Sequence, residues 1–193
     1  MFNLTDAANG LFGAWRLIHF DRSGLQYFRV TPDAFWNSFW AAAIVIPGEV
    51  IGAILLAQGD EAATLHADPF HSLLVFIGTY LIAWLLFALV MAGYLEAIQR
   101  GERFVLFVVA WNWARVVRMA IILPTVAIFA MEGTSEPGWG AAIYMAAMAG
   151  TLVYAGFVAR TALDVPIRTA VAVVVIEIGL STVLWLGAQV MLG

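Results

Sequence analysis

Five long apolar stretches follow one another along the chain, and short polar segments separate them. They cover residues 36–57, 70–94, 104–131, 139–160 and 167–192. Each stretch can cross a hydrocarbon core of about 30 Å as a helix, which rises about 1.5 Å per residue. The pattern predicts an all-α polytopic membrane protein. Because the connections are short, we expect an up-down bundle in which consecutive spans are antiparallel neighbours, or nearly so.

Residues 1–30 precede the first span and form the only stretch of mixed polarity. Apolar side chains recur there at three- and four-residue steps, at Leu4, Ala8, Leu11, Phe12, Trp15 and Ile18. This spacing predicts an amphipathic helix over residues 4–20. Its apolar face could lie in the headgroup region of the membrane, or it could pack against the cytoplasmic ends of the bundle.

Residues 31–193 form the membrane-spanning unit in this prediction. Thr31 is placed to cap a helix that has Pro32 at its first position. Residues typical of a membrane–water interface flank this start, at Trp15, Arg16, Trp36 and Trp40.

The fourth span carries a stripe of small residues. They are spaced by four positions, at Gly138, Ala142, Ala146 and Gly150. Such a stripe lies on one helix face and lets another helix approach closely. We expect it to pack inside the bundle, with a homodimer interface as the alternative.

The chain has nine arginines and no lysine, and the arginines are distributed unevenly. Seven of them precede the first span or lie between spans 2 and 3 or spans 4 and 5, at Arg16, Arg22, Arg29, Arg100, Arg103, Arg160 and Arg168. The connections 58–69 and 132–138 carry acidic residues and no arginine. By the positive-inside rule, the N-terminus is cytoplasmic and the C-terminus lies outside. Arginine without lysine, together with many alanines and glycines, is typical of GC-rich bacteria, so we expect the bacterial inner membrane.

Composition excludes several classes of protein. With 63 % hydrophobic and 11 % charged residues, the chain is no soluble domain. It has no cysteine for a disulfide or a nucleophile, and the usual nucleotide and zinc-protease motifs are missing. A net charge of −4 without a basic tract argues against nucleic-acid binding. His66, Asp68 and His71 offer too few ligands for a metal site, so we expect no metal and no cofactor.

Five polar residues inside the spans are the candidates for chemistry: Glu49, Asn112, Arg115, Arg118 and Glu177. A charge near the bilayer centre is costly, so such residues usually pair inside a bundle or line a polar path. Counted along their helices, Glu49, Arg118 and Glu177 lie at depths of about 20, 22 and 14 Å. These depths predict that Arg118 pairs with Glu49 first and with Glu177 second.

Three interpretations of these residues stay open. The two acids and two arginines could form ion pairs that join the first, third and fifth spans. The arginines could instead snorkel to the cytoplasmic interface, with Trp111 and Trp113 as an aromatic belt. The residues could also form a working polar site for an ion, a proton or a lipid headgroup.

An amphipathic lead-in followed by five spans and tight loops resembles the small Yip1-like membrane proteins. In addition, the string Phe20-Asp21, Gly24, Phe28, Thr31-Pro32 and Phe35-Trp36-x-Ser38-Phe39 resembles small uncharacterised bacterial inner-membrane proteins. The first resemblance implies a role in membrane shaping or trafficking. Neither resemblance implies a catalytic residue.

No catalytic constellation is visible, and spanning and packing account for most residues. We therefore expect a non-enzymatic membrane accessory, scaffold or membrane-organising protein that contacts the lipid bilayer and either another membrane protein or a second copy. A small transporter and an intramembrane enzyme acting on lipid are the alternatives. A dry bundle with paired charges favours a scaffold, a water-filled cavity that reaches the charges favours transport, and a lateral groove lined by them favours lipid chemistry.

The first testable prediction concerns orientation. Alkaline phosphatase should be active when it is fused after Gly193 or inserted near Glu61, because it folds only outside the cytoplasm, and it should be inactive near Arg100. A cytoplasmic C-terminus would contradict the five-span topology.

Overall fold

The computed structural model describes residues 3–57, 69–132 and 138–192, and the regular structure within them is helical. Its elements are α1 (Leu4–Ile18), the 3-10 helix η1 (Arg22–Tyr27), α2 (Pro32–Ser38), α3 (Trp40–Ala57), α4 (Pro69–Ala97), the 3-10 helix η2 (Gly101–Arg103), α5 (Phe104–Glu132), α6 (Trp139–Leu163) and α7 (Ile167–Leu192). Among these residues, five segments are long and apolar enough to cross a membrane: Pro32–Ala57, Phe70–Ala97, Gly101–Glu132, Trp139–Leu163 and Ile167–Leu192. The predicted all-α polytopic fold is thus confirmed, and each predicted span agrees with a helix to within a few residues.

Capping hydrogen bonds and backbone conformation account for where several helices begin and end. The Thr31 hydroxyl accepts a hydrogen bond from the Ala34 amide at 3.2 Å, and Pro32 occupies the first helical position, as predicted. The first span bends where α2 passes into α3, and there the Ser38 hydroxyl donates to the Phe35 carbonyl at 2.7 Å. At the other end of the chain, Asp164 adopts a left-handed φ of 52° and ends α6 two residues before Pro166.

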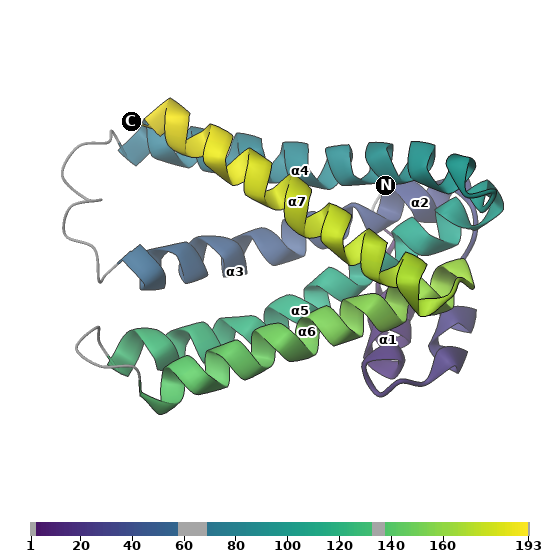
Figure 1. Ribbon diagram of the computed structural model, residues 1–193, viewed down its shortest axis with the longest axis horizontal. Coiled ribbons are helices and arrows are strands. Elements are labelled where there is room, and N and C mark those ends of the chain that lie inside the picture. The colour runs from purple at the N-terminus through teal and green to yellow at the C-terminus, as the bar shows by residue number, and fades with distance from the viewer. Residues whose placement is uncertain (1–2, 58–68, 133–137, 193) are drawn as a thin grey trace.

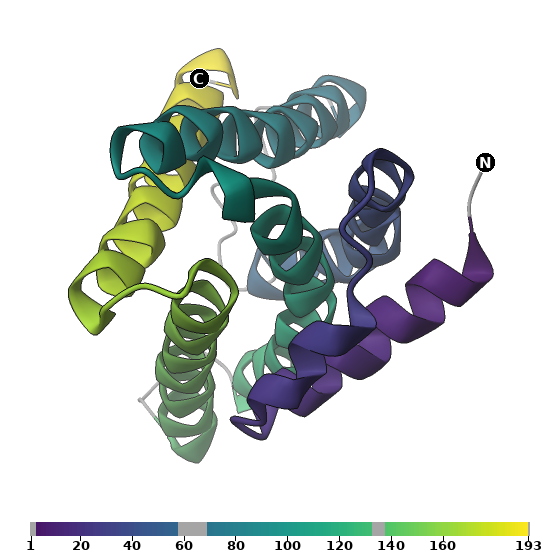
Figure 2. The same cartoon turned by 90° about the vertical axis from the view of Figure 1, so that its right-hand side faces the viewer.

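Helix α5 lies at the centre of the bundle and packs chiefly against α6 and α3 (Figure 1). Helix α7 packs against α4 and α6, so that the helices follow the order α3, α5, α6, α7, α4 around the molecule (Figure 2). Helix α3 therefore has α5, and not the next span along the chain, as its main neighbour. The sequence permits this, because the eleven residues between α3 and α4 can reach about 35 Å when extended.

Helix α1 runs across the spans at the end of the bundle opposite the C-terminus, an end that we call the α1 end (Figures 1 and 2). Its buried face consists of small residues, Leu17 and one acid: Asp6, Ala7, Gly10, Gly13, Ala14 and Leu17. Three bulky residues of the predicted apolar face point outward, with Leu4 75 %, Phe12 48 % and Trp15 57 % exposed, whereas Leu11 and Ile18 are half-buried and pack against the core. The segment therefore packs on the bundle through one face and presents the other, larger apolar face to its surroundings.

Two very close approaches hold α1 in place. A Cβ atom on Gly10 would lie 2.4 Å from Nε1 of the buried Trp113 on α5. A Cβ atom on Gly13 would lie 2.8 Å from the carbonyl oxygen of Gly24 in η1. Both distances are shorter than non-bonded atoms tolerate, so only glycine lets the helix come this near.

The small-residue stripe of the fourth span does not pack inside the bundle. Gly138, Ala142, Ala146 and Gly150 are all exposed, and a Cβ atom on Gly150 would meet nothing within 4 Å. The expectation of internal packing is therefore wrong. Helix α6 instead buries a face near its second half that includes Tyr154, Val158 and Ala162.

The second prediction tests the α1 contact. Gly13→Ala should lower the free energy of unfolding by about 1–3 kcal/mol, because backbone atoms must move to admit the methyl group. Gly93→Ala on α4 is the matched control, since its Cβ meets nothing within 4 Å, and it should be neutral or slightly stabilising. Unfolding in detergent, followed by tryptophan fluorescence, measures both. Equal stability of the two variants would contradict the close approach.

Candidate functional site

Glu177 on α7 is the centre of a buried charge triad that also contains Arg115 and Arg118 on α5. The Glu177 side chain is 8 % exposed. Arg115 donates to its Oε1 from Nε at 3.3 Å and from Nη2 at 3.1 Å. Arg118 donates from Nη1 to both carboxylate oxygens, at 3.0 and 2.9 Å. One carboxylate thus serves two guanidinium groups, and these charge-assisted bonds are the strong kind.

The spacing on α5 explains why both arginines reach the same acid. Residues three positions apart lie on one face of a helix, about one turn from each other. The side chains of Arg115 and Arg118 are 15 % and 22 % exposed, so both are largely withdrawn from the surroundings. A long arginine stem spans the distance to α7, which packs on α4 and α6 rather than on α5.

Aromatic rings on α4 hold Arg115 from a second side. Its guanidinium carbon lies 4.5 Å from the ring centroid of Trp84 and 5.3 Å from that of Phe87. Phe87 in turn stacks on Trp111 of α5, with ring centroids 5.3 Å apart. All three rings are buried. A cation over a desolvated aromatic face gains about 2 kcal/mol, so the triad ties α4, α5 and α7 together.

Glu49 on α3 lies near the triad but is not part of it. It interacts electrostatically with both arginines, yet within the described residues it forms no ion pair closer than 4.0 Å. The prediction that Arg118 pairs first with Glu49 is therefore wrong, and the second choice, Glu177, is the partner. The reason is that Gly48 faces α5, where its Cβ would lie 2.7 Å from the Met119 sulfur. The next residue on a helix is turned away by about 100°.

Asn112 also lies apart from the triad. Its side-chain amide donates to the Ser38 hydroxyl at 2.9 Å, and both residues are buried. This bond joins α5 to the bend between α2 and α3. Trp111 and Trp113 are 1 % and 2 % exposed, so the interpretation that makes them an interfacial belt is wrong. Trp36 and Trp40, by contrast, are 66 % and 49 % exposed, as interfacial residues would be.

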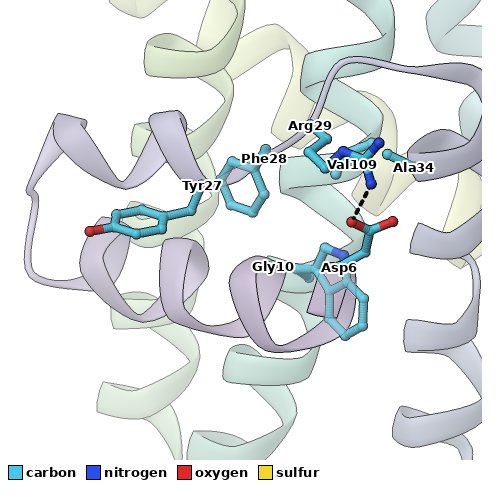
Figure 3. Close-up of a pocket in the computed structure, with 8 residues that line it drawn as sticks. Asp6, Gly10, Tyr27, Phe28, Arg29, Ala34 and Val109 are labelled. Carbon is cyan, nitrogen blue, oxygen red and sulfur yellow. Dashed lines mark hydrogen bonds and ion pairs between the residues drawn. The ribbon is translucent and has the colours of Figure 1, made fainter. Parts of the chain in front are cut away.

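Asp6 is a polar group that the sequence analysis missed. Its carboxylate accepts hydrogen bonds from Arg29 Nη1 at 3.0 Å and from Asn37 Nδ2 at 3.3 Å, and it is 8 % exposed. Figure 3 shows the Arg29 contact beside a small pocket that Gly10 helps to line. An acid in the first turn of a helix also interacts favourably with the helix dipole. Its place in the first turn of α1 was the signal that the sequence offered for a role of Asp6. Its partners could not be read from the sequence, because Arg29 and Asn37 are 23 and 31 residues away.

Arg16 is held by its neighbours rather than left free for phosphates. Its Nε donates to Asp21 Oδ2 at 2.7 Å, and its guanidinium lies 5.8 Å from the Tyr27 ring centroid. Hydrogen bonds from Ser23, and then from Arg16, lower the pKa of Asp21 to about 2. Asp21 therefore stays ionised at neutral pH and fixes the junction between α1 and η1.

Two pockets lie at the α1 end. The first is the small pocket beside Asp6, lined also by Trp113 and Val109. The second, which we call the basic hollow, has a volume of about 530 Å³ and is lined by Arg22, Leu25, Arg103, Arg160, Thr161, Asp164, Val165 and Pro166. Neither pocket is lined by Arg115, Arg118 or Glu177.

Metal ligands do not gather in the described part of the chain. Across residues 3–57, 69–132 and 138–192, no three His, Cys, Asp or Glu side chains are placed to hold an ion. His66 and Asp68 lie outside the described residues. Comparison of the chain with protein-family models, curated proteins and solved structures gave no match. The resemblance to Yip1-like proteins therefore stays an expectation, and inferences about function depend on the residues themselves.

The third prediction concerns the triad. Glu177→Leu should cost about 3–5 kcal/mol of unfolding free energy, because it leaves two buried cations uncompensated. Replacing Arg115, Arg118 and Glu177 together by leucine should recover most of that loss, since no unpaired charge remains. Glu49→Leu is the control and should lower the unfolding free energy by less, because Glu49 forms no ion pair with a described residue.

Unfolding titrations in detergent provide the measurement. The triad is contradicted if the losses in unfolding free energy of the three single leucine variants, at Arg115, Arg118 and Glu177, sum to the loss of the triple variant. It is also contradicted if Glu49→Leu costs as much as Glu177→Leu.

Proposed function

We propose that the protein is a non-enzymatic scaffold or accessory subunit of a bacterial inner membrane, with its N-terminus in the cytoplasm. One observation carries this proposal: three of the four charged residues predicted inside the spans, Arg115, Arg118 and Glu177, hold the bundle's own helices together. Glu177 binds both arginines, and neither the pocket beside Asp6 nor the basic hollow is lined by them. A transporter or an intramembrane enzyme would leave such groups beside an open volume.

The outer surface supports a role in assembly. Helix α6 exposes its whole stripe of small residues, and Met145 beside it is 66 % exposed. Small residues on the outside of a spanning helix are typical of helix–helix contacts in membranes. The partner is then another membrane protein or a second copy of this chain.

The fourth prediction tests assembly. The chain, extracted with its lipids into polymer-bounded discs and cross-linked, should appear in a complex of fixed stoichiometry. Ala146→Trp should break that complex, because a large side chain prevents close approach of a partner helix. Leu89→Trp on α4 is the matched control: Leu89 is 71 % exposed, and its replacement should leave the complex intact. A single uncomplexed chain at every concentration would contradict the proposal.

Transport is the second candidate, and Glu49 is the observation that favours it. This half-buried carboxylate lies inside a span and forms no ion pair with a described residue. Proteoliposomes that contain the chain and a trapped pH-sensitive dye distinguish the two functions. A scaffold should give no proton flux above empty vesicles, whereas flux that Glu49→Gln abolishes would establish transport instead.

A further inference from the structure

The basic hollow gathers three arginines from separate parts of the chain. Arg22 comes from η1, Arg103 from η2 and Arg160 from the last turn of α6. The left-handed turn at Asp164 closes the hollow from a fourth side. The fold thus brings together arginines that lie up to 138 positions apart, at the end of the bundle where α1 packs (Figure 2).

Positive charge in this hollow is poorly compensated. Asp164 is the one acid among the lining residues, and it reaches Arg103 at 4.0 Å, the limit of an ion pair. Arg22 and Arg160 form no ion pair with any residue that the structure describes. Three guanidinium groups around one carboxylate leave two positive charges in excess. Their mutual repulsion falls when an anion binds between them.

The rest of the lining is suited to a particular kind of anion. Thr161 lines the hollow, and its hydroxyl oxygen is buried without a hydrogen-bond partner among the described residues. Leu25, Val165 and Pro166 add an apolar wall. A free inorganic ion gains nothing from apolar contacts, whereas the glycerol and upper acyl carbons of a lipid do.

We propose that the basic hollow binds a phosphate group, and that the phosphate belongs to the headgroup of an anionic phospholipid. Arginine presents planar, forked donors that match phosphate oxygens. A volume of about 530 Å³ suits a headgroup, since small-molecule sites typically measure about 300–1,000 Å³. The hollow lies where α5 begins, α6 ends and α7 begins, which is the level of the headgroups for helices that span a bilayer. This site is independent of the scaffold function proposed above.

Native mass spectrometry of the full chain in mild detergent tests the proposal. Phosphatidylglycerol and phosphatidylcholine, added in equal amounts, should compete for the protein, and the wild type should retain phosphatidylglycerol. Arg103→Gln with Arg160→Gln should reduce this preference by about 25-fold, at roughly fivefold per arginine. Arg100→Gln with Arg168→Gln is the matched control, because it removes the same charge at the same end from residues that do not line the hollow. Melting curves of both variants establish that they fold.

A second arm separates the lipid from a soluble anion. Inorganic phosphate is titrated against each variant, and binding is followed by the broadening of its ³¹P resonance. Lipid preference that the hollow variant loses and the control keeps supports the proposal. Inorganic phosphate binding without a lipid preference overturns the lipid assignment. Equal losses in both variants, or no binding of either ligand by the wild type, overturn the site.

Discussion

The rest of the structure depends on the need to neutralise charge in a medium that solvates it poorly. Two arginines on α5 carry their charges into the middle of the bundle, where an unpaired ion is expensive. Glu177 accepts from both, and the Trp84 ring covers one of them. Because α7 packs on α4 and α6, these bonds are the main link between α7 and the central helix. The triad therefore selects one arrangement of α4, α5 and α7 over the alternatives that apolar packing alone would allow.

The two ends of the bundle are built differently. The α1 end holds a packed layer in which α1 contacts α5 at Gly10 and η1 at Gly13, while Asp6 joins it to Arg29 and Asn37. The same end contains the basic hollow. Polar interactions are thus concentrated at one end and in the triad, and most of the remaining described surface is apolar.

The corrections to the predicted site share a cause. A stripe of small residues on α6 predicts a close helix contact, but four-residue spacing says nothing about which side of the helix faces the bundle, and Gly150 lies open. Depth along a span placed Glu49 level with Arg118, but depth does not specify rotation about the helix axis, which turns Gly48 toward Met119 instead. In α1, the pattern of apolar residues did not specify which of them face the bundle: small residues such as Gly10 and Gly13 are buried there, whereas Phe12 and Trp15 are exposed.

The sequence by itself determined the all-α class, the five spans and the helix start at Thr31 and Pro32, because length, hydropathy and capping are properties of neighbouring residues. It also identified Arg115, Arg118 and Glu177 as costly charges that need compensation. Only the tertiary structure decided that Glu177 serves both arginines, that Asn112 bonds to Ser38, and that Asp6 binds Arg29. Those pairings join residues 23 to 74 positions apart. They follow from the order and rotation of packed helices, which a pattern along one chain does not specify.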